Sequence, residues 1–207
     1  MINIRNLILL VFMGSLSFTA QSAEPPYSAP VDADYPKNVY WGDTHLHTRN
    51  SADAYSLGNM NLTPADAFRF AQGQELIAHN GMRVQLRRPL DFLVVSDHAE
   101  YLGGYYRFNV GDSLVNETSA GRQWQGYLEE GDPVKLIRAF TASMADPKNN
   151  YPFPEKVRRL IWKDVAMTAD EYNKPGQFTA FTGYEWTSMI EGNNLHRVVV
   201  YKDGADK

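Results

Sequence analysis

The chain has 207 residues, 43% of them hydrophobic, and a formal net charge of −4 at neutral pH. This length suits one domain with a hydrophobic core of its own. The acidic balance argues against nucleic acid as a partner, because contacts with phosphate groups need a basic surface. Cysteine is absent from the sequence. Disulfides and thiolate ligands are therefore excluded, and any metal ion must be held by His, Asp and Glu.

The first 23 residues have the pattern of a signal peptide. Arg5 lies near the amino terminus, Leu7–Phe12 is apolar, and small residues near Ala23 suit cleavage. The apolar run is short for a membrane span, so we expect a periplasmic or secreted protein with no span after cleavage; a retained amino-terminal anchor is the alternative. Residues 24–37 contain four prolines and are predicted to be an extended lead-in, which leaves 38–207 as the domain.

The first predicted strand, Val39–Thr44, leads into a pair of histidines. Side chains alternate along a strand, so Asp43, His45 and His47 are expected on one face. Two adjacent imidazoles form half of a site for a divalent transition metal. Asp53 follows where the chain leaves the strand and can fold back as a third donor. The alternative is a pair of surface histidines in a polar turn.

A helix and a second strand are predicted next. Thr63 is the expected N-cap of a helix that ends near Gly73. The run Asp91–Ser96 is typical of a strand buried on both faces, and it ends in Asp97 and His98. Strand, helix and strand, with polar side chains at the carboxyl ends of the strands, indicate an α/β fold. In such folds sites gather at that edge of the sheet.

Residues 101–175 are predicted to be a helical insertion over the sheet and a candidate wall of a substrate cleft. Trp124 and Trp162 are expected to pack within it rather than to form a sugar-binding surface. His79, outside the insertion, has no patterned neighbours and is interpreted as an ordinary surface histidine. Helices of the insertion are expected at Arg122–Glu130, Pro133–Met144 with Asp132 as N-cap, and Glu155–Tyr172.

A hairpin is predicted near the end of the chain. Gln177–Tyr184 is the third expected strand, with Glu185 at its end, and Arg197–Tyr201 is the fourth. The connection is too short for a parallel crossover, so the two strands should be antiparallel about a turn at Glu191–Asn194. This pairing is expected to place Glu185 opposite His196, which brings a carboxylate and an imidazole together.

Four short motifs follow one another along the chain: Gly-Asp-Thr-His-Leu-His-Thr, Val-Val-Ser-Asp-His-Ala-Glu, Gly-Tyr-Glu-Trp and Leu-His-Arg-Val. In that order they resemble motifs of the polymerase-and-histidinol-phosphatase (PHP) superfamily, and most of all its secreted bacterial branch known as domain of unknown function 3604. The resemblance covers essentially the whole mature chain. It implies a distorted barrel of seven β/α units whose carboxyl-end loops hold two or three Zn, Mn or Fe ions, and hydrolysis of phosphate esters.

The resemblance also implies a role for individual residues. Asp43 and Asp97 would accept hydrogen bonds from metal-bound imidazoles and fix their tautomers. Arg197 would hold a substrate oxyanion, with pairing to an acidic residue as the alternative. Glu185 would bridge two ions. The full set of implied metal ligands is His45, His47, Asp53, His98, Glu185 and His196.

The sequence departs from the PHP pattern at its end. PHP barrels supply a further Asp-x-His pair from a late strand, and no such pair follows His196. Closing a barrel would take about three strands more than the four expected here. We therefore expect an incomplete barrel, the amino-terminal part of a longer enzyme, in which this chain alone holds only part of the site.

The function predicted for the intact protein is that of a metal-dependent hydrolase. A phosphoesterase acting on a small anionic ester is the first hypothesis. A non-catalytic periplasmic module for metal binding or interaction is the second. A hydrolase that acts on a sulfate ester, a lactone or an amide is the third, because fold does not choose among these substrates. The oligomeric state has no signal in the sequence.

Overall fold

The computed structural model describes residues 36–144, 151–190 and 193–207. The chain divides into two compact units, residues 1–39 and 40–207, and each is considered by itself. In the first unit the described residues, 36–39, have no helix or strand. The expected signal peptide and most of the expected lead-in lie outside the described residues. Among those described, none of the helices is both long and apolar enough to cross a membrane.

A three-stranded parallel sheet is the centre of the second unit. Its order is β1 (Gly42–Leu46), β4 (Phe92–Val95) and β5 (Thr179–Phe181). Leu93 and Val94 of the middle strand are 0% exposed, which confirms a strand covered on both faces. β1 begins later than the predicted Val39 because its pairing with β4 starts at Gly42. Within the described residues the parallel sheet has two open edges and does not close into a barrel.

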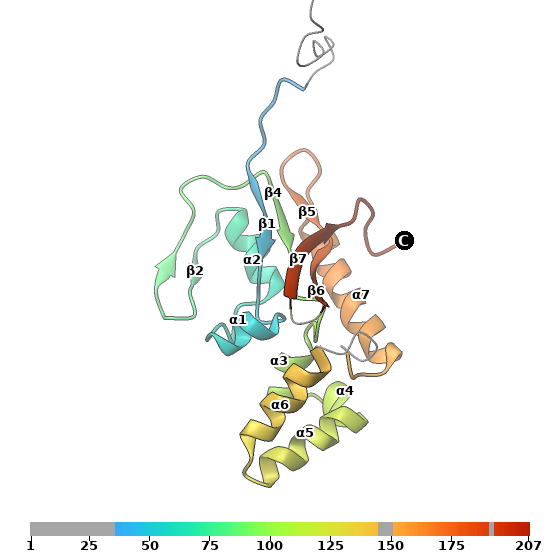
Figure 1. Ribbon diagram of the computed structural model, residues 1–207. Helices are drawn as coiled ribbons and strands as arrows, with labels where there is room; N and C mark the ends of the chain where they lie inside the picture. Colours follow the sequence, from blue (N-terminus) through green and yellow to red (C-terminus); the bar gives the residue numbers. More distant parts are fainter. Residues whose placement is uncertain (1–35, 145–150, 191–192) are drawn as a thin grey trace, which may run out of the picture. The chain divides into compact units, whose positions relative to one another are not determined.

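Two helices cover one face of this sheet, α2 (Pro64–Ala71) and α7 (Glu155–Tyr172) (Figure 1). Thr63 and Asp66 cap α2 reciprocally, as the sequence predicts for its start. Burial of large side chains at this interface contributes about 1.5–3 kcal/mol each. The core between helices and sheet consists of Phe68, Ala71, Leu93, Val95, Ala169, Phe178 and Ala180.

The predicted third strand is divided in two at Thr182. β5 belongs to the parallel sheet, whereas β6 (Gly183–Ile190) pairs with β7 (Asn193–Val200) in an antiparallel hairpin. Gly183 permits the change of direction. A Cβ atom at this position would lie 2.5 Å from Val94 Cγ1 and 2.8 Å from the Val199 carbonyl oxygen. At Gly183 the backbone of β6 therefore lies closer to Val94 of the middle strand and to the neighbouring strand β7 than a side chain allows.

The predicted register of the hairpin is wrong by two residues. Thr187 lies opposite His196, and Glu185 lies opposite Val198. The cause is the position of the turn. Because Ile190 pairs with Asn193, the hairpin turns one residue later in the chain than a pairing of Glu185 with His196 requires; residues 191–192 lie outside the described part. An offset of two residues keeps side chains on the same face. Glu185 and His196 are therefore diagonal neighbours on one face of the hairpin.

The expected insertion is helical and has a core of its own. It contains α3 (Gly104–Asn109), α4 (Ser113–Asn116), α5 (Ser119–Glu129) and α6 (Pro133–Met144). Trp124 is buried in it, which confirms a packing role. Asp132 accepts a hydrogen bond from the Lys135 amide at the start of α6, as predicted. The remaining elements are short: α1 (Ala52–Ser56), β2 (Leu76–Ile77) and β3 (Arg83–Val84). The fold is thus mixed α/β with a parallel sheet and a late antiparallel hairpin.

Candidate metal centre

The carboxyl ends of β1 and β4 meet the β6–β7 hairpin, and the six predicted ligands come together there. Their donor atoms form three overlapping groups, each with all atoms within 4.8 Å of one another. Four separate segments of the chain contribute to them. The groups are His45, His47 and Glu185; His47, Asp53 and His98; and His98, Glu185 and His196. His79, by contrast, is exposed and belongs to none of these groups.

Glu185 lies at the centre of the cluster and its side chain is 1% exposed. Its Oε2 atom is 2.9 Å from His45 Nε2 and 2.7 Å from His47 Nε2, while its Oε1 atom is 2.9 Å from His196 Nδ1. Burial by itself raises the pKa of Glu185. The hydrogen bond with His45 and the nearby imidazoles, His98 foremost, outweigh it and hold the pKa below its ordinary value. The carboxylate is therefore ionised at neutral pH.

Backbone contacts hold Glu185 next to the second predicted motif. The Glu185 amide donates to the Asp97 carbonyl at 3.1 Å, and the Ala99 amide donates to the Glu185 carbonyl at 2.7 Å. These two bonds make a single parallel bridge between His98 and Glu185. The bridge explains how a ligand on the hairpin reaches a ligand that follows the parallel sheet.

Asp53 lies between the two half-buried imidazoles of His47 and His98. It lies 3.1 Å from His47 Nδ1 and 3.5 Å from His98 Nε2. The Ser51 hydroxyl donates to the same carboxylate. Burial raises the pKa of Asp53, but its hydrogen bonds with His47, His98 and Ser51 lower it far below the ordinary range. Burial lowers the pKa of His47 and of His98, but the nearby carboxylates, Asp53 foremost and Glu185 after it, together raise both by more, so both end above the ordinary value of 6.5.

The His47 Nε2 atom shows that these donors fit a metal ion. The atom is buried and has no hydrogen-bond partner among the described residues, although Glu185 Oε2 lies 2.7 Å away. Two ligands bound to one ion at about 2.1 Å lie about 3 Å apart without hydrogen bonding to each other. Imidazole nitrogen and carboxylate oxygen are both common ligands of divalent metal ions. The buried His and Glu side chains of this cluster are thus able to hold a metal ion.

Asp43 and Asp97 make different contacts from those expected. Asp43 accepts a hydrogen bond from the backbone amide of His45 at 2.8 Å. Asp97 accepts from the Thr48 amide at 2.5 Å and from the Thr48 hydroxyl at 2.7 Å. Burial raises the pKa of Asp97 to about 6, against the opposing effect of these two bonds. In the described part of the chain, both carboxylates hold the backbone of the segment that carries His45 and His47, rather than an imidazole.

Arg197 does not reach the cluster. It lies opposite Trp186 in the hairpin, and strand alternation turns its side chain to the face away from His196. The expected contact with a substrate held at the metal centre therefore has no support from the position of this residue.

Two residues without a predicted role complete the cluster. Glu100 is 4% exposed. Its Oε1 atom accepts a hydrogen bond from the Thr187 amide at 3.1 Å. Its Oε2 atom lies 3.7 Å from His98 Nδ1 and has no hydrogen-bond partner among the described residues. The Thr187 hydroxyl lies 3.2 Å from His98 Nδ1 and 3.3 Å from His196 Nδ1. Each follows a predicted ligand by two residues, and that spacing is the signal by which the sequence could have indicated them.

Comparisons with known proteins give one family. The model of the family described as "Protein of unknown function (DUF3604)" matches residues 34–207. Neither the curated proteins nor the solved structures gave a match. The matched range includes every residue of the three candidate groups. The chain belongs to the DUF3604 family.

Proposed function

We propose that this protein is a metal-dependent hydrolase of the PHP type, and that its reaction is the hydrolysis of a phosphate ester. One observation carries the proposal. Glu185 is a buried, ionised carboxylate whose two oxygens lie against different imidazoles, which is the arrangement of a carboxylate that bridges two ions. The order of the motifs along the chain, and the position of the first two at the carboxyl ends of parallel strands, support the PHP assignment.

The chemistry of imidazole decides how the ligands divide among ions. A neutral imidazole has one free lone pair, so His47 and His98, each present in two of the groups, serve one ion each. One consistent division gives the first ion His45, His47 and Glu185. The second ion then takes Asp53 and His98, and a third takes His196 and the other oxygen of Glu185. The proposal is thus for two or three ions of Zn, Mn or Fe.

When bound, divalent ions lower the pKa of a water molecule to near neutrality and neutralise charge on a phosphate group. The protein's own residues hold the geometry that this needs. Glu185, as a bridging ligand, sets the distance between two neighbouring metal positions. Glu100 and Thr187 lie beside His98 Nδ1, so they favour a tautomer whose Nε2 lone pair faces Asp53. Asp97 and Thr48 hold the loop after β1.

The proposed substrate is a small anionic ester, since a cluster of divalent ions attracts phosphate oxygens. The proposed location is the periplasm or the cell exterior, and it rests on the pattern of residues 1–23.

The test compares the wild-type protein with His45→Ala and with His79→Ala, a matched control at an exposed histidine outside the cluster. Metal content is measured by mass spectrometry and turnover with p-nitrophenyl phosphate. We expect His45→Ala to lose metal and at least a hundredfold in turnover, and His79→Ala to match the wild type. Equal turnover in wild type and His45→Ala would remove the hydrolase proposal.

A second panel separates the other hypotheses. It contains a sulfate ester, a lactone and an amide, each assayed with the metal-loaded protein. Turnover that depends on His45 with one of these substrates, but not with the phosphate ester, changes the substrate class. Bound metal with no turnover across the panel would favour a non-catalytic metal-binding module.

A further inference from the structure

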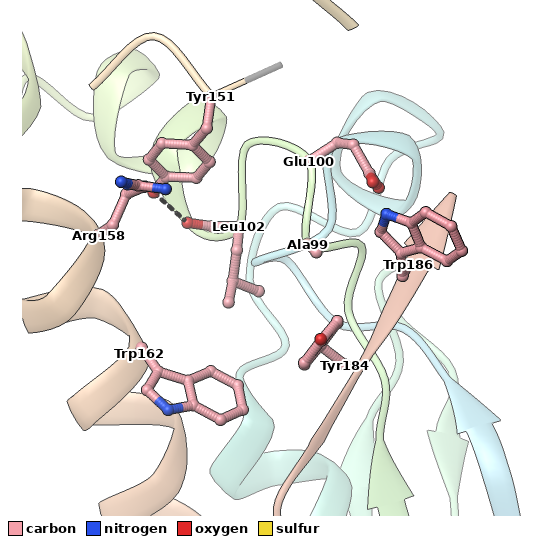
Figure 2. A pocket seen from close by; sticks show the side chains of 8 residues that line it. All are labelled: Ala99, Glu100, Leu102, Tyr151, Arg158, Trp162, Tyr184 and Trp186. Carbon is pink, nitrogen blue, oxygen red and sulfur yellow. Dashed lines mark hydrogen bonds between the residues drawn. The ribbon is translucent and has the colours of Figure 1, made fainter. Parts of the chain in front are cut away.

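A cavity of about 240 Å³ lies beside the candidate metal centre, and its walls are mainly aromatic rather than imidazole and carboxylate groups (Figure 2). Four aromatic residues line it: Tyr151, Trp162, Tyr184 and Trp186. Its volume is below the roughly 300–1,000 Å³ of sites for drug-sized ligands, so it suits one small ring system.

The pattern of β6 separates this cavity from the metal centre. Tyr184 and Trp186 flank Glu185 in the strand, and successive side chains of a strand point to opposite faces. The carboxylate therefore points to the imidazoles, while the two aromatic side chains point into the cavity. One strand thus serves two separate surfaces.

The aromatic walls are held in place before any ligand binds. Arg158 and Trp162 are four residues apart on α7 and so lie on the same face of the helix. The Trp162 ring meets the Tyr184 ring edge to face, with centroids 5.7 Å apart. The Tyr151 hydroxyl donates to the Leu102 carbonyl at 3.1 Å, the bond drawn in Figure 2. Fixed rings reduce the entropy lost when a ligand is bound.

The charged side chain that lines the cavity and is exposed to solvent is positive, whereas the acidic one is buried. Arg158 is exposed, makes no ion pair with any described residue, and lies 5.8 Å from the centroid of the Tyr151 ring. Arg197 lies opposite Trp186 in the hairpin register, on the same face. The acid in the wall, Glu100, is buried, accepts a hydrogen bond from the Thr187 amide and lies near His98. Stacking surfaces beside an unpaired guanidinium are complementary to an aromatic ring that carries an anionic group.

We propose that this cavity is a binding site for a small planar aromatic anion, separate from the metal centre. The ring of the ligand packs against Trp162, Tyr184 and Trp186, and its anionic group pairs with Arg158. The proposal stands on the cavity alone and does not depend on hydrolase activity.

The experiment is isothermal titration calorimetry of the metal-free protein with two probes, indole-3-acetate and its neutral analogue indole-3-acetamide. We expect the acetate to bind at least tenfold more tightly than the acetamide. Arg158→Gln should remove that difference and leave acetamide binding unchanged. Arg159→Gln, at a neighbouring arginine that pairs with Glu155, is the matched control and should behave as the wild type.

Two further variants test the aromatic walls. Trp186→Ala and Trp162→Ala should each weaken both probes at least tenfold; Trp186 is 42% exposed, so its replacement leaves the fold intact. His45→Ala, in the metal centre, should bind both probes as the wild type does. No binding at millimolar concentrations, equal affinity for the two probes, or affinity unchanged in Trp186→Ala would each overturn the proposal.

Discussion

Acidification should release the metal from this protein at a pH set by two imidazoles. The pKa values of His47 and His98 both lie above 6.5, because Asp53 and Glu185 together raise them by more than burial lowers them. Only a neutral imidazole binds a metal ion, so protons compete with the metal. With a pKa of 6.5, the neutral fraction of an imidazole falls about eightfold between pH 6 and pH 5. A metal ion bound by one of these imidazoles should therefore bind about eightfold more weakly at pH 5 than at pH 6, because of the protonation of that one side chain.

The measurement is the zinc affinity of the protein between pH 5 and pH 8, by competition with a chelating dye whose own pH dependence is known. Asp53→Asn is the informative variant. It removes the largest of the upward effects on the pKa of both imidazoles, so its affinity, although weaker throughout, should begin to fall at a lower pH than that of the wild type. An affinity that changes less than twofold between pH 6 and pH 5 would contradict the assignment of these imidazoles as ligands.

Three other substitutions test the centre and the fold that holds it. Glu185→Gln removes the charge of the proposed bridging ligand, and we expect the purified protein to lose most of its metal by mass spectrometry while its circular dichroism stays unchanged; full metal content would show that Glu185 is not a ligand. Gly183→Ala inserts a methyl group 2.5 Å from Val94 Cγ1 and should lower the free energy of unfolding by about 1–3 kcal/mol in urea denaturation; an unchanged urea midpoint would contradict the packing at this position. Asp97→Asn tests the raised pKa of a buried acid, about 6 against an ordinary 3.8. Because the ionised form is disfavoured in the folded state, the acid lowers stability as the pH rises through 6, so the effect of Asp97→Asn on the metal-free protein should be about 1.4 kcal/mol more favourable at pH 7.5 than at pH 5; equal effects at the two pH values would refute this.

The sequence indicates the cluster because the donors lie at the ends of strongly patterned segments. His45 lies near the carboxyl end of β1, His47 follows that strand, and His98 follows the buried β4. Carboxyl ends of parallel strands meet at one edge of a sheet, so their convergence follows from local pattern alone. The only local signal for Glu100 and Thr187 is their spacing of two residues from His98 and Glu185, which many ordinary polar residues share. Their contacts with His98 exist only once the hairpin is placed.

The hairpin register shows where local reasoning ends. Glu185 and His196 share a face in both the predicted and the observed pairing, because a shift of two residues preserves the alternation. Their exact partners depend on where the chain turns between β6 and β7, and sequence pattern constrains this poorly.

Residue types and periodicity by themselves determined the buried strand and the bounds of α6 and α7, and the resemblance of four motifs to the PHP superfamily implied the six candidate ligands. These properties depend on alternation, capping and burial within short segments. Only the tertiary structure decided that Asp97 holds the Thr48 backbone, that Arg197 faces away from the cluster, and that aromatic side chains flanking Glu185 line a cavity. Such contacts join residues far apart in the chain, and their geometry is set by packing against elements that no local pattern describes.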